Sequence, residues 1–212
     1  MSRPLVIAVD GPAAAGKGTL AKALAAKLGL PYLDTGLLYR AVARRMVNAG
    51  LDPAGDASAQ AQALQPEDLA RTDLRVPEID RGASLVAVQP AVRAALLDRQ
   101  RVFATQTGAV VDGRDIGTVV FPDADVKFFI TASPRTRALR RHHQVHGEAP
   151  LAEADLEAAV AEIVARDSRD SSRDTAPLVQ AADAVLIETD DLSAEQVLEK
   201  ACEEVARRQV RS

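Results

Sequence analysis

A glycine-rich loop between an apolar run and a helical pattern is the segment whose residues most clearly do chemistry. The apolar run covers residues 5–9, the helical pattern covers residues 20–28, and Lys17 stands between them. Glycines let successive backbone N–H groups curl around phosphate oxygens, and the start of the following helix favours negative charge. A lysine here reaches the β- and γ-phosphates of a nucleotide. A chance strand-to-helix turn with this spacing is rare, so we expect nine residues to bind phosphate: Gly11, Pro12, Ala13, Ala14, Ala15, Gly16, Lys17, Gly18 and Thr19.

The residue after the lysine narrows the class of protein. Gly18 stands where most phosphate-binding loops carry the Ser or Thr that ligates Mg²⁺, and Thr19 follows one position later. We therefore expect Mg²⁺ to be held by phosphates and water, since this ion dehydrates reluctantly. The Gly-Lys-Gly-Thr ending resembles nucleoside monophosphate kinases more than GTPases.

A charged segment, Asp112-Gly113-Arg114-Asp115, follows an apolar run that indicates a buried strand. Side chains at the carboxyl end of a parallel strand point into the ligand crevice. Asp112 is placed to hold water on Mg²⁺, and Arg114 to clamp a phosphate with two hydrogen bonds. Asp115 is an acceptor suited to the exocyclic amine of cytosine. The alternative is a turn stabilised by an Asp–Arg pair.

A second candidate phosphate site follows the second predicted strand, Tyr32-Leu33, in Asp34-Thr35-Gly36 and Tyr39-Arg40. The Thr35 hydroxyl stands at a helix N-terminus and Arg40 lies one turn into that helix, so both can meet a phosphate. In the alternative interpretation, Thr35 is only a helix cap and Arg40 is a solvated helix residue.

Arginines are concentrated in residues 135–173. One predicted helix carries Arg135, Arg137, Arg140 and Arg141, and a second carries Arg166, Arg169, Asp170 and Arg173. Spacings of three and four residues place the second set near one helix face. Phosphoryl transfer needs positioning and charge stabilisation, which an arginine-lined lid that excludes water provides. The alternative is a solvated basic helix, which we favour for Arg137 and Arg141. His142, His143 and His146 are expected on the exposed lid surface.

The composition limits the classes of partner. The chain has 212 residues, a formal net charge of −4 and one cysteine, Cys202. No global basic field favours a nucleic-acid polymer as partner, and a single cysteine allows no disulfide within the chain. Because no apolar run reaches 18 residues and no signal-peptide pattern begins the sequence, we expect a soluble cytoplasmic protein with no membrane partner.

The arrangement of apolar runs predicts an α/β fold with a parallel sheet. Five runs indicate buried strands: 5–9, Tyr32-Leu33, 109–111, 126–130 and 184–187. Helical stretches adjoin them, as in a doubly wound sheet. Ser133-Pro134 predicts a helix start, Gly147 the end of that helix, and Ser193 with Gln196 a capping box for a last helix over 194–208.

We therefore expect a single domain whose core pattern is interrupted twice. The predicted core comprises residues 1–34, 94–134 and 174–212, with an insertion over 35–93 and a lid over 135–173. In P-loop kinases, insertions at these places cover the acceptor and donor phosphates. Position alone also allows two helical additions without that role. The Ala/Gln-rich stretch 54–65 is expected to be a mobile connection with one short helix.

Four segments together resemble bacterial cytidylate kinases over nearly the whole chain. They are the loop at 11–19, Asp34 to Arg40, the stretch DGRDIGTVVFP at 112–122, and Arg166 to Asp170 with Ala176-Pro177-Leu178. The stretch at 112–122 is the most specific of them, because the loop alone fits many kinases.

The resemblance implies a P-loop NTPase three-layer fold with a five-stranded parallel sheet, and transfer of the γ-phosphoryl of ATP to CMP or dCMP with Mg²⁺. It implies that Ser84, Arg93 and Asp115 contact cytosine. Thr35, Arg40 and Arg114 would hold the acceptor phosphate, and Asp170 with Arg173 would hold ribose or phosphate. The expected catalytic set is Lys17, Arg114, Arg135, Arg140, Arg169 and Arg173.

The chain departs from the family pattern in two places. Thr35 stands where Ser is usual, and the segment between Met46 and Arg75 is too short for the extra β-structured piece of many bacterial members. Two other classes remain open at this stage. One is a kinase for UMP, AMP or a metabolite such as shikimate, although a carboxylate at position 115 disfavours UMP. The other is a nucleotide-dependent switch. A monomer is expected, since the lobes of a kinase must close.

Overall fold

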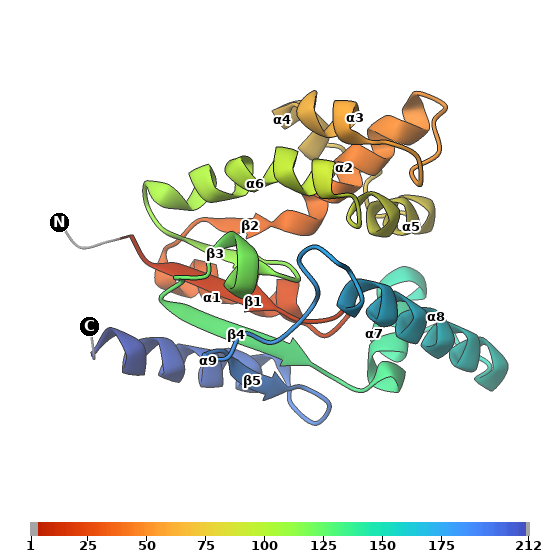
Figure 1. Ribbon diagram of the computed structural model, residues 1–212. Helices are drawn as coiled ribbons and strands as arrows, with labels where there is room; N and C mark the ends of the chain where they lie inside the picture. Colours follow the sequence, from red (N-terminus) through yellow and green to blue (C-terminus); the bar gives the residue numbers. More distant parts are fainter. Residues whose placement is uncertain (1–3, 211–212) are drawn as a thin grey trace.

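The computed structural model describes residues 4–210 and contains a five-stranded, fully parallel sheet in the order β2-β3-β1-β4-β5 (Figure 1). This confirms the predicted fold class, with each strand within a residue or so of its expected place. The strands are β1 Val6–Asp10, β2 Tyr32–Asp34, β3 Ala109–Asp112, β4 Val126–Thr131 and β5 Val185–Glu188. The two ends of the predicted core, residues 1–3 and 211–212, lie outside the described residues.

Helices cover both faces of the sheet and account for most of the remaining chain. They are α1 Lys17–Leu28, α2 Thr35–Asn48, α3 Ser58–Gln62, α4 Pro66–Leu69, α5 Pro77–Val86, α6 Pro90–Thr105, the π-helical turn η1 Ile116–Val120, α7 Pro134–His146, α8 Glu153–Ser171 and α9 Ala194–Gln209. In this part of the chain, no helix has both the length and the apolar character that a membrane span requires.

The alternation of side chains along β1 assigns the helices to the two faces of the sheet. Ile7 and Val9 belong to one buried cluster with residues of α1 and α9. Ala8 belongs to another, with Ala104 of α6 and Ile116 of η1. Neighbouring residues of a strand point to opposite faces, so α1 and α9 pack on one side and α6 with η1 on the other.

Several predicted helix ends are confirmed by their caps. The Ser133 hydroxyl accepts from the backbone N–H of Thr136 at the start of α7, and Gly147 ends that helix. Ser193 and Gln196 form a capping box at the start of α9. The helix of the phosphate-binding loop, however, begins at Lys17 and not at residue 20. The apolar pattern detects only buried packing positions, and the first turn of α1 is committed to the loop.

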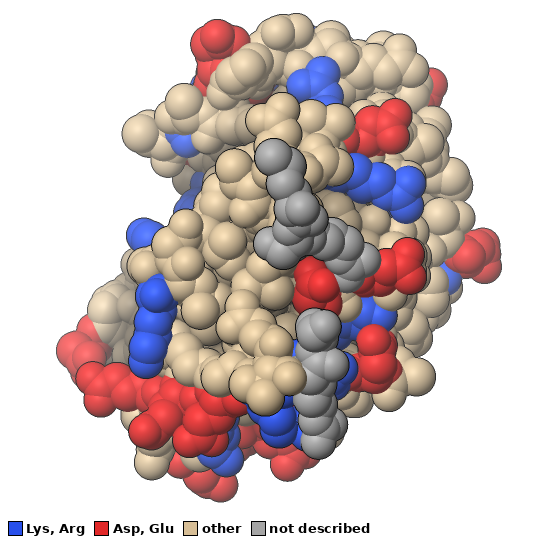
Figure 2. Space-filling model, turned by 90° about the vertical axis from the view of Figure 1, so that its left-hand side faces the viewer, with Lys and Arg blue, Asp and Glu red and all other residues tan. Residues whose placement is uncertain are grey.

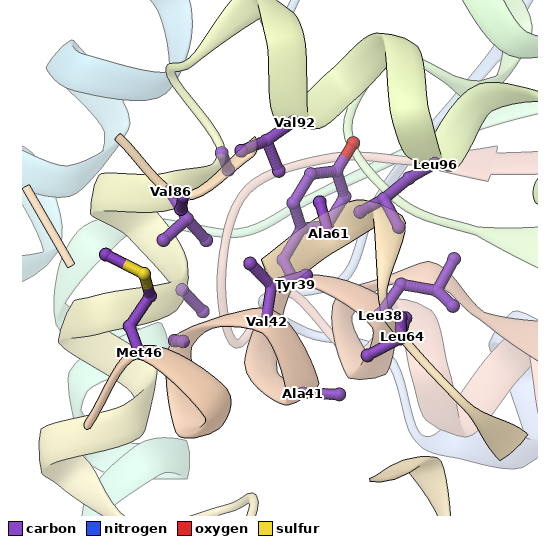
Figure 3. Packing of buried hydrophobic residues seen from close by; sticks show 14 of the residues in the cluster. Leu38, Tyr39, Ala41, Val42, Met46, Ala61, Leu64, Val86, Val92 and Leu96 are labelled. Atoms are coloured by element: carbon purple, nitrogen blue, oxygen red, sulfur yellow. The ribbon is translucent and has the colours of Figure 1, made fainter. Parts of the chain in front are cut away.

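The segment between β2 and β3 has a core of its own, built around α2. Figure 3 shows Tyr39 and Val42 of α2 surrounded by side chains of α3, α5 and α6, among them Ala61, Val86 and Leu96. Residues 46–75 contain the short helices α3 and α4 and no strand. The expectation that this chain lacks the extra β-structured piece is therefore correct. The mobility expected for residues 54–65 stays a prediction, and its one short helix, α3, is present.

The two helices α7 and α8 pack against each other beside the carboxyl ends of the strands (Figure 1). Their shared core is small, with Ala138, Leu156 and Ile163 buried. Figure 2 views the molecule from the left-hand side of Figure 1, whereas α7 and α8 lie at the right of Figure 1. On the face that Figure 2 shows, acidic side chains gather in the lower part and basic ones are spread singly.

Candidate active site

The loop after β1 has the backbone geometry that a phosphate-binding loop requires. Gly11 adopts φ of +143°, and a side chain there would place its Cβ 2.0 Å from the Ile130 carbonyl oxygen. Only glycine fits such a close approach between two backbones. Gly16, with φ of 95°, turns the chain into α1, and Lys17 follows as a buried first residue of the helix. Its Nζ donates to the Pro12 carbonyl oxygen at 2.8 Å, so the ammonium lies across the loop.

The carboxyl end of β3 brings Asp112 against this loop. Its Oδ2 accepts from the Tyr32 hydroxyl at 2.9 Å. A side chain at Gly18 would place its Cβ 3.1 Å from the same oxygen. The carboxylate therefore occupies space next to the position where most phosphate-binding loops carry a Ser or Thr. This arrangement fits a Mg²⁺ ion held through water, as the sequence predicts, and the assignment of Asp112 to it stays a prediction.

Burial shifts the pKa values of both Lys17 and Asp112. Burial, and then the positive charge of Arg114, lower the pKa of Lys17 to about 7. Burial, and then the negative charge of Asp34, raise the pKa of Asp112 above its usual range. Groups whose charges are destabilised in this way are expected where a protein is built to receive a charged ligand.

Asp10 is a buried charged residue next to the site that the sequence pattern did not single out. It ends β1 and is buried, and its two carboxylate oxygens accept from the backbone N–H groups of Ile116 and Gly117 at 2.8 and 2.7 Å. These two donors begin η1, directly after Arg114 and Asp115. Asp10 therefore joins the start of the phosphate-binding loop to the segment that carries two predicted ligand contacts. The available signal was a charged residue at the end of an otherwise apolar strand.

We expect Asp10 to make stability depend on pH. Burial raises its pKa from 3.8 to about 6, against the effect of its two N–H donors. The protonated Asp10 side chain therefore makes its full favourable contribution to the free energy of unfolding below about pH 3.8, and this contribution is lost as pH rises through about 6. Between pH 7.5 and pH 5, the wild type should gain about 1 kcal/mol of unfolding free energy relative to Asp10→Asn. Urea titrations of both proteins at the two pH values measure this, and parallel pH profiles would contradict it.

Two of the three predicted cytosine contacts meet near the start of α6. Arg93 and Asp115 form a buried ion pair between the Arg93 guanidinium and Asp115 Oδ2. The Arg93 guanidinium also lies over the Tyr39 ring, with 5.6 Å between its carbon and the ring centre. Ser84 of α5 is buried, and its hydroxyl has no hydrogen-bond partner among the described residues. A buried hydroxyl without a partner is costly, and the contact of Ser84 with cytosine stays a prediction.

A second group of charges joins β3 to the end of α8. Asp170 is buried and accepts from Arg114 Nε at 3.1 Å. Its other oxygen pairs with Arg173. Burial opposes the charge of Asp170, but Arg114 and Arg173 hold the pKa of that carboxyl below its usual value. The structure therefore brings together three of the residues predicted to contact the acceptor nucleotide.

A cavity of about 530 Å³ extends from the phosphate-binding loop between α5 and the helices α7 and α8. Its walls include Ala13, Asp80, Ser84, Arg141, Arg166 and Arg169. Arg166, one of the predicted lid arginines, was not in the expected catalytic or nucleotide-binding set. Burial, and then the charge of Arg114, lower the pKa of Arg166 to about 10, and its Nε has no partner among the described residues. The cavity thus joins the predicted donor side to Ser84, and several arginines stand in its walls.

Thr35 and Arg40 lie at the start of α2, as expected, but both have partners within the protein. The Thr35 hydroxyl donates to the Asp112 carbonyl oxygen at 2.7 Å and so ties the ends of β2 and β3 together. Arg40 Nε donates to Asp80 Oδ1 at 2.8 Å. Contact of either residue with a phosphate stays a prediction.

Arg137 corrects an interpretation made from the sequence. The solvated alternative that we favoured for it is wrong, since Arg137 is only 3% exposed. It donates to the Ala13 carbonyl oxygen at 3.3 Å and to Asp167 of α8 at 2.6 Å. Arg137 therefore ties α7 and α8 to the phosphate-binding loop. Arg141 is half-buried and pairs with Asp80, so it is not a freely solvated residue either.

The other predicted lid arginines are not brought to one point. Arg135 is exposed and pairs with the equally exposed Glu153 at the start of α8. Arg140 donates to the Thr189 hydroxyl and carbonyl oxygens, next to the carboxyl end of β5. Arg169 lines the cavity. A catalytic role for each stays a prediction. Of the three histidines expected on the lid surface, His143 and His146 are exposed and His142 is half-buried.

The parallel sheet, the lysine-bearing loop that opens α1 and the carboxylates at the strand ends define a P-loop kinase. Two solved structures share the fold. One is an uncharacterized protein from Eubacterium ventriosum ATCC 27560, with a TM-score of 0.57 and 13% identity over 95% of this chain and 98% of that one. The other is a gluconokinase from Sinorhizobium meliloti 1021, with a TM-score of 0.52 and 16% identity over 98% and 94%.

Sequence comparison identifies the family. The profile of the cytidylate kinase family matches residues 7–207. A cytidylate kinase of Acidiphilium cryptum is 59% identical over 92% of both chains. A cytidylate kinase of Granulibacter bethesdensis is 57% identical over 96% of this chain and 97% of that one. The chain belongs to the cytidylate kinase family.

Proposed function

We propose that this protein transfers the γ-phosphoryl group of ATP to CMP or dCMP, giving ADP with CDP or dCDP. Family membership supports this activity. The observation in the structure that carries it is the buried Arg93–Asp115 pair, whose arginine also donates to the Ala87 carbonyl oxygen at the end of α5. The same helix carries the unpartnered Ser84 hydroxyl, and a cavity leads from Ser84 to the phosphate-binding loop. Cytosine offers an amine donor and ring acceptors, which suit a carboxylate, a guanidinium and a hydroxyl.

The donor side is proposed to work through the loop and Lys17. Loop N–H groups and the start of α1 bind the ATP phosphates, while Lys17 approaches the β- and γ-phosphates from its place across the loop. Those phosphates favour the charged ammonium form, which burial alone disfavours. Asp112 and the phosphates would hold Mg²⁺ through water, and the ion would neutralise charge on the β- and γ-oxygens.

The acceptor side needs no dedicated general base, because the attacking group is already an anionic phosphate. Arg114 is held by Asp170 at 3.1 Å through Nε, and its Nη1 donates to the Gly113 carbonyl oxygen at 3.2 Å, so Nη2 is the terminal nitrogen best placed to face a phosphate. We propose that Thr35 and Arg40 also bind the acceptor phosphate, and that Asp170 and Arg173 contact ribose or phosphate. Arginines of the lid would stabilise the charge that develops on the transferring group.

We propose that residues 35–93 form the monophosphate-binding insertion and residues 135–173 form the lid. Separate cores support this division, since α2, α3, α5 and the start of α6 pack around Tyr39 and α7 packs on α8. Elements with their own cores can move as units and exclude water when they close. We also propose that the enzyme is a cytoplasmic monomer, because each chain carries both the loop and the acceptor side of the cavity.

A coupled ADP-release assay with ATP and Mg²⁺ tests this function, with CMP, dCMP, UMP and AMP compared as acceptors. We expect rapid turnover with CMP and dCMP and much slower turnover with UMP and AMP. Comparable rates with UMP would retain the kinase and contradict the Asp115–cytosine contact. A lack of stimulation by every monophosphate would contradict the acceptor class.

A further inference from the structure

Asp80 is a buried carboxylate of α5 that the reaction outlined above does not use. Its side chain is only 9% exposed and pairs with two arginines from different elements. Oδ1 accepts from Arg40 Nε of α2 at 2.8 Å, and Oδ2 accepts from Arg141 of α7 at 2.5 Å. The single carboxylate thus joins the insertion, which holds Arg40, to the lid, which holds Arg141.

The Arg40 contact leaves the phosphate-binding part of that side chain free. Within residues 4–210, Asp80 is the acceptor that the structure gives to Arg40, and it is reached through Nε. The terminal nitrogens lie toward the first turn of α2, where a Cβ on Gly36 would fall 2.6 Å from one of them. Thr35 starts the same turn. Nη1 therefore lies near the site proposed for the acceptor phosphate, and the contact of Nε with Asp80 fixes the orientation of the guanidinium.

This inference rests on the proposed function. It concerns how the acceptor phosphate is recognised. We propose that Asp80 is a positioning residue that presents Arg40 to the acceptor phosphate and links this presentation to the lid through Arg141. A guanidinium held at Nε keeps its two terminal nitrogens in one orientation, which two hydrogen bonds to a phosphate require. Withdrawal of Arg141 would leave Asp80 with one arginine and loosen that orientation.

The charge of Asp80 is suited to this role. Burial opposes the ionised form, but the charge of Arg40 and the hydrogen bond from Arg141 hold the pKa of the carboxyl below its usual value. Arg166 lies close enough to interact with both Asp80 and Arg40. Asp80 therefore separates arginines that would otherwise repel one another beside the cavity. Replacement by an amide keeps the shape and removes the charge.

The test is steady-state kinetics of Asp80→Asn, with KM for CMP and for ATP measured separately. We expect the KM for CMP to rise about tenfold, which corresponds to the loss of one charge-assisted hydrogen bond. The KM for ATP should stay within about twofold of the wild-type value. Asp80→Glu, which keeps the charge, should recover part of the loss. Arg141→Met combined with Asp80→Asn should give a smaller total effect than the product of the two single effects, because both act through one carboxylate.

The control is Asp68→Asn, which breaks another Arg–Asp pair of the insertion, Arg45–Asp68 at 3.0 Å. It should leave both KM values unchanged, and thermal melting shows whether each variant is folded. An unchanged or lower KM for CMP in Asp80→Asn would overturn the inference, and a lower value would make Asp80 a competitor of the phosphate. If Asp80→Asn does not fold, unchanged CMP affinity in Arg141→Met overturns it. Absence of CMP turnover in the wild type would instead refute the proposed function.

Discussion

Replacement of Lys17 by alanine is expected to lower kcat by about 1,000-fold, because it removes a preorganised charge from beside the transferring phosphoryl group. Lys17 is buried and lies across the loop, with its Nζ 2.8 Å from the Pro12 carbonyl oxygen. Among the described lysines, Lys22 and Lys27 are exposed on later turns of α1, and Lys127 donates to the Pro122 carbonyl oxygen and to Asp183. Single-turnover measurements with saturating ATP and CMP would give the rate of the chemical step directly.

Two further variants separate chemistry from folding. Lys17→Met keeps the apolar stem of the side chain and should be as inactive as Lys17→Ala. Lys22→Ala changes an exposed lysine of the same helix and should keep nearly the wild-type rate. Circular dichroism establishes that each variant is folded. A folded Lys17→Ala protein with a rate near that of the wild type would refute the proposed role.

Asp115→Asn is expected to damage the choice of base more than any other single change. The ion pair with Arg93 uses Asp115 Oδ2 and leaves Oδ1 to accept from the amine of cytosine. An asparagine amide can accept from cytosine or donate to the O4 atom of uracil. We expect kcat/KM for CMP to fall about 100-fold and the preference for CMP over UMP to fall at least about tenfold.

The same change carries a cost in stability that must be measured beside it. Asp115→Asn leaves Arg93 buried without its counter-charge, and breaking such a pair costs about 3–5 kcal/mol. Activity should therefore be assayed well below the melting temperature of the variant. Asp73→Asn breaks the exposed Arg71–Asp73 pair and serves as the control, with little effect on either property. Equal losses for CMP and UMP in Asp115→Asn would contradict the proposed contact.

The sequence by itself determined the phosphate-binding loop, the order of the strands along the chain and most helix ends. Each of these depends on interactions between residues a few positions apart, such as the caps at Ser133 and Ser193. The strand ends Asp112 and Asp34 could also be placed at one edge, since carboxyl ends of parallel strands meet there. Local spacing carries this information because the hydrogen bonds and packing contacts involved are themselves local.

Only the tertiary structure decided which charged residues meet. The chain holds many arginines of similar local context, and spacing alone did not reveal that Arg137 is buried on the loop while Arg135 faces solvent. Asp10 finds its two N–H donors more than one hundred positions away, and Asp80 joins arginines from α2 and α7. Such partners depend on how whole helices dock, because the energy of a buried charge is set by the groups packed around it and not by its neighbours in sequence.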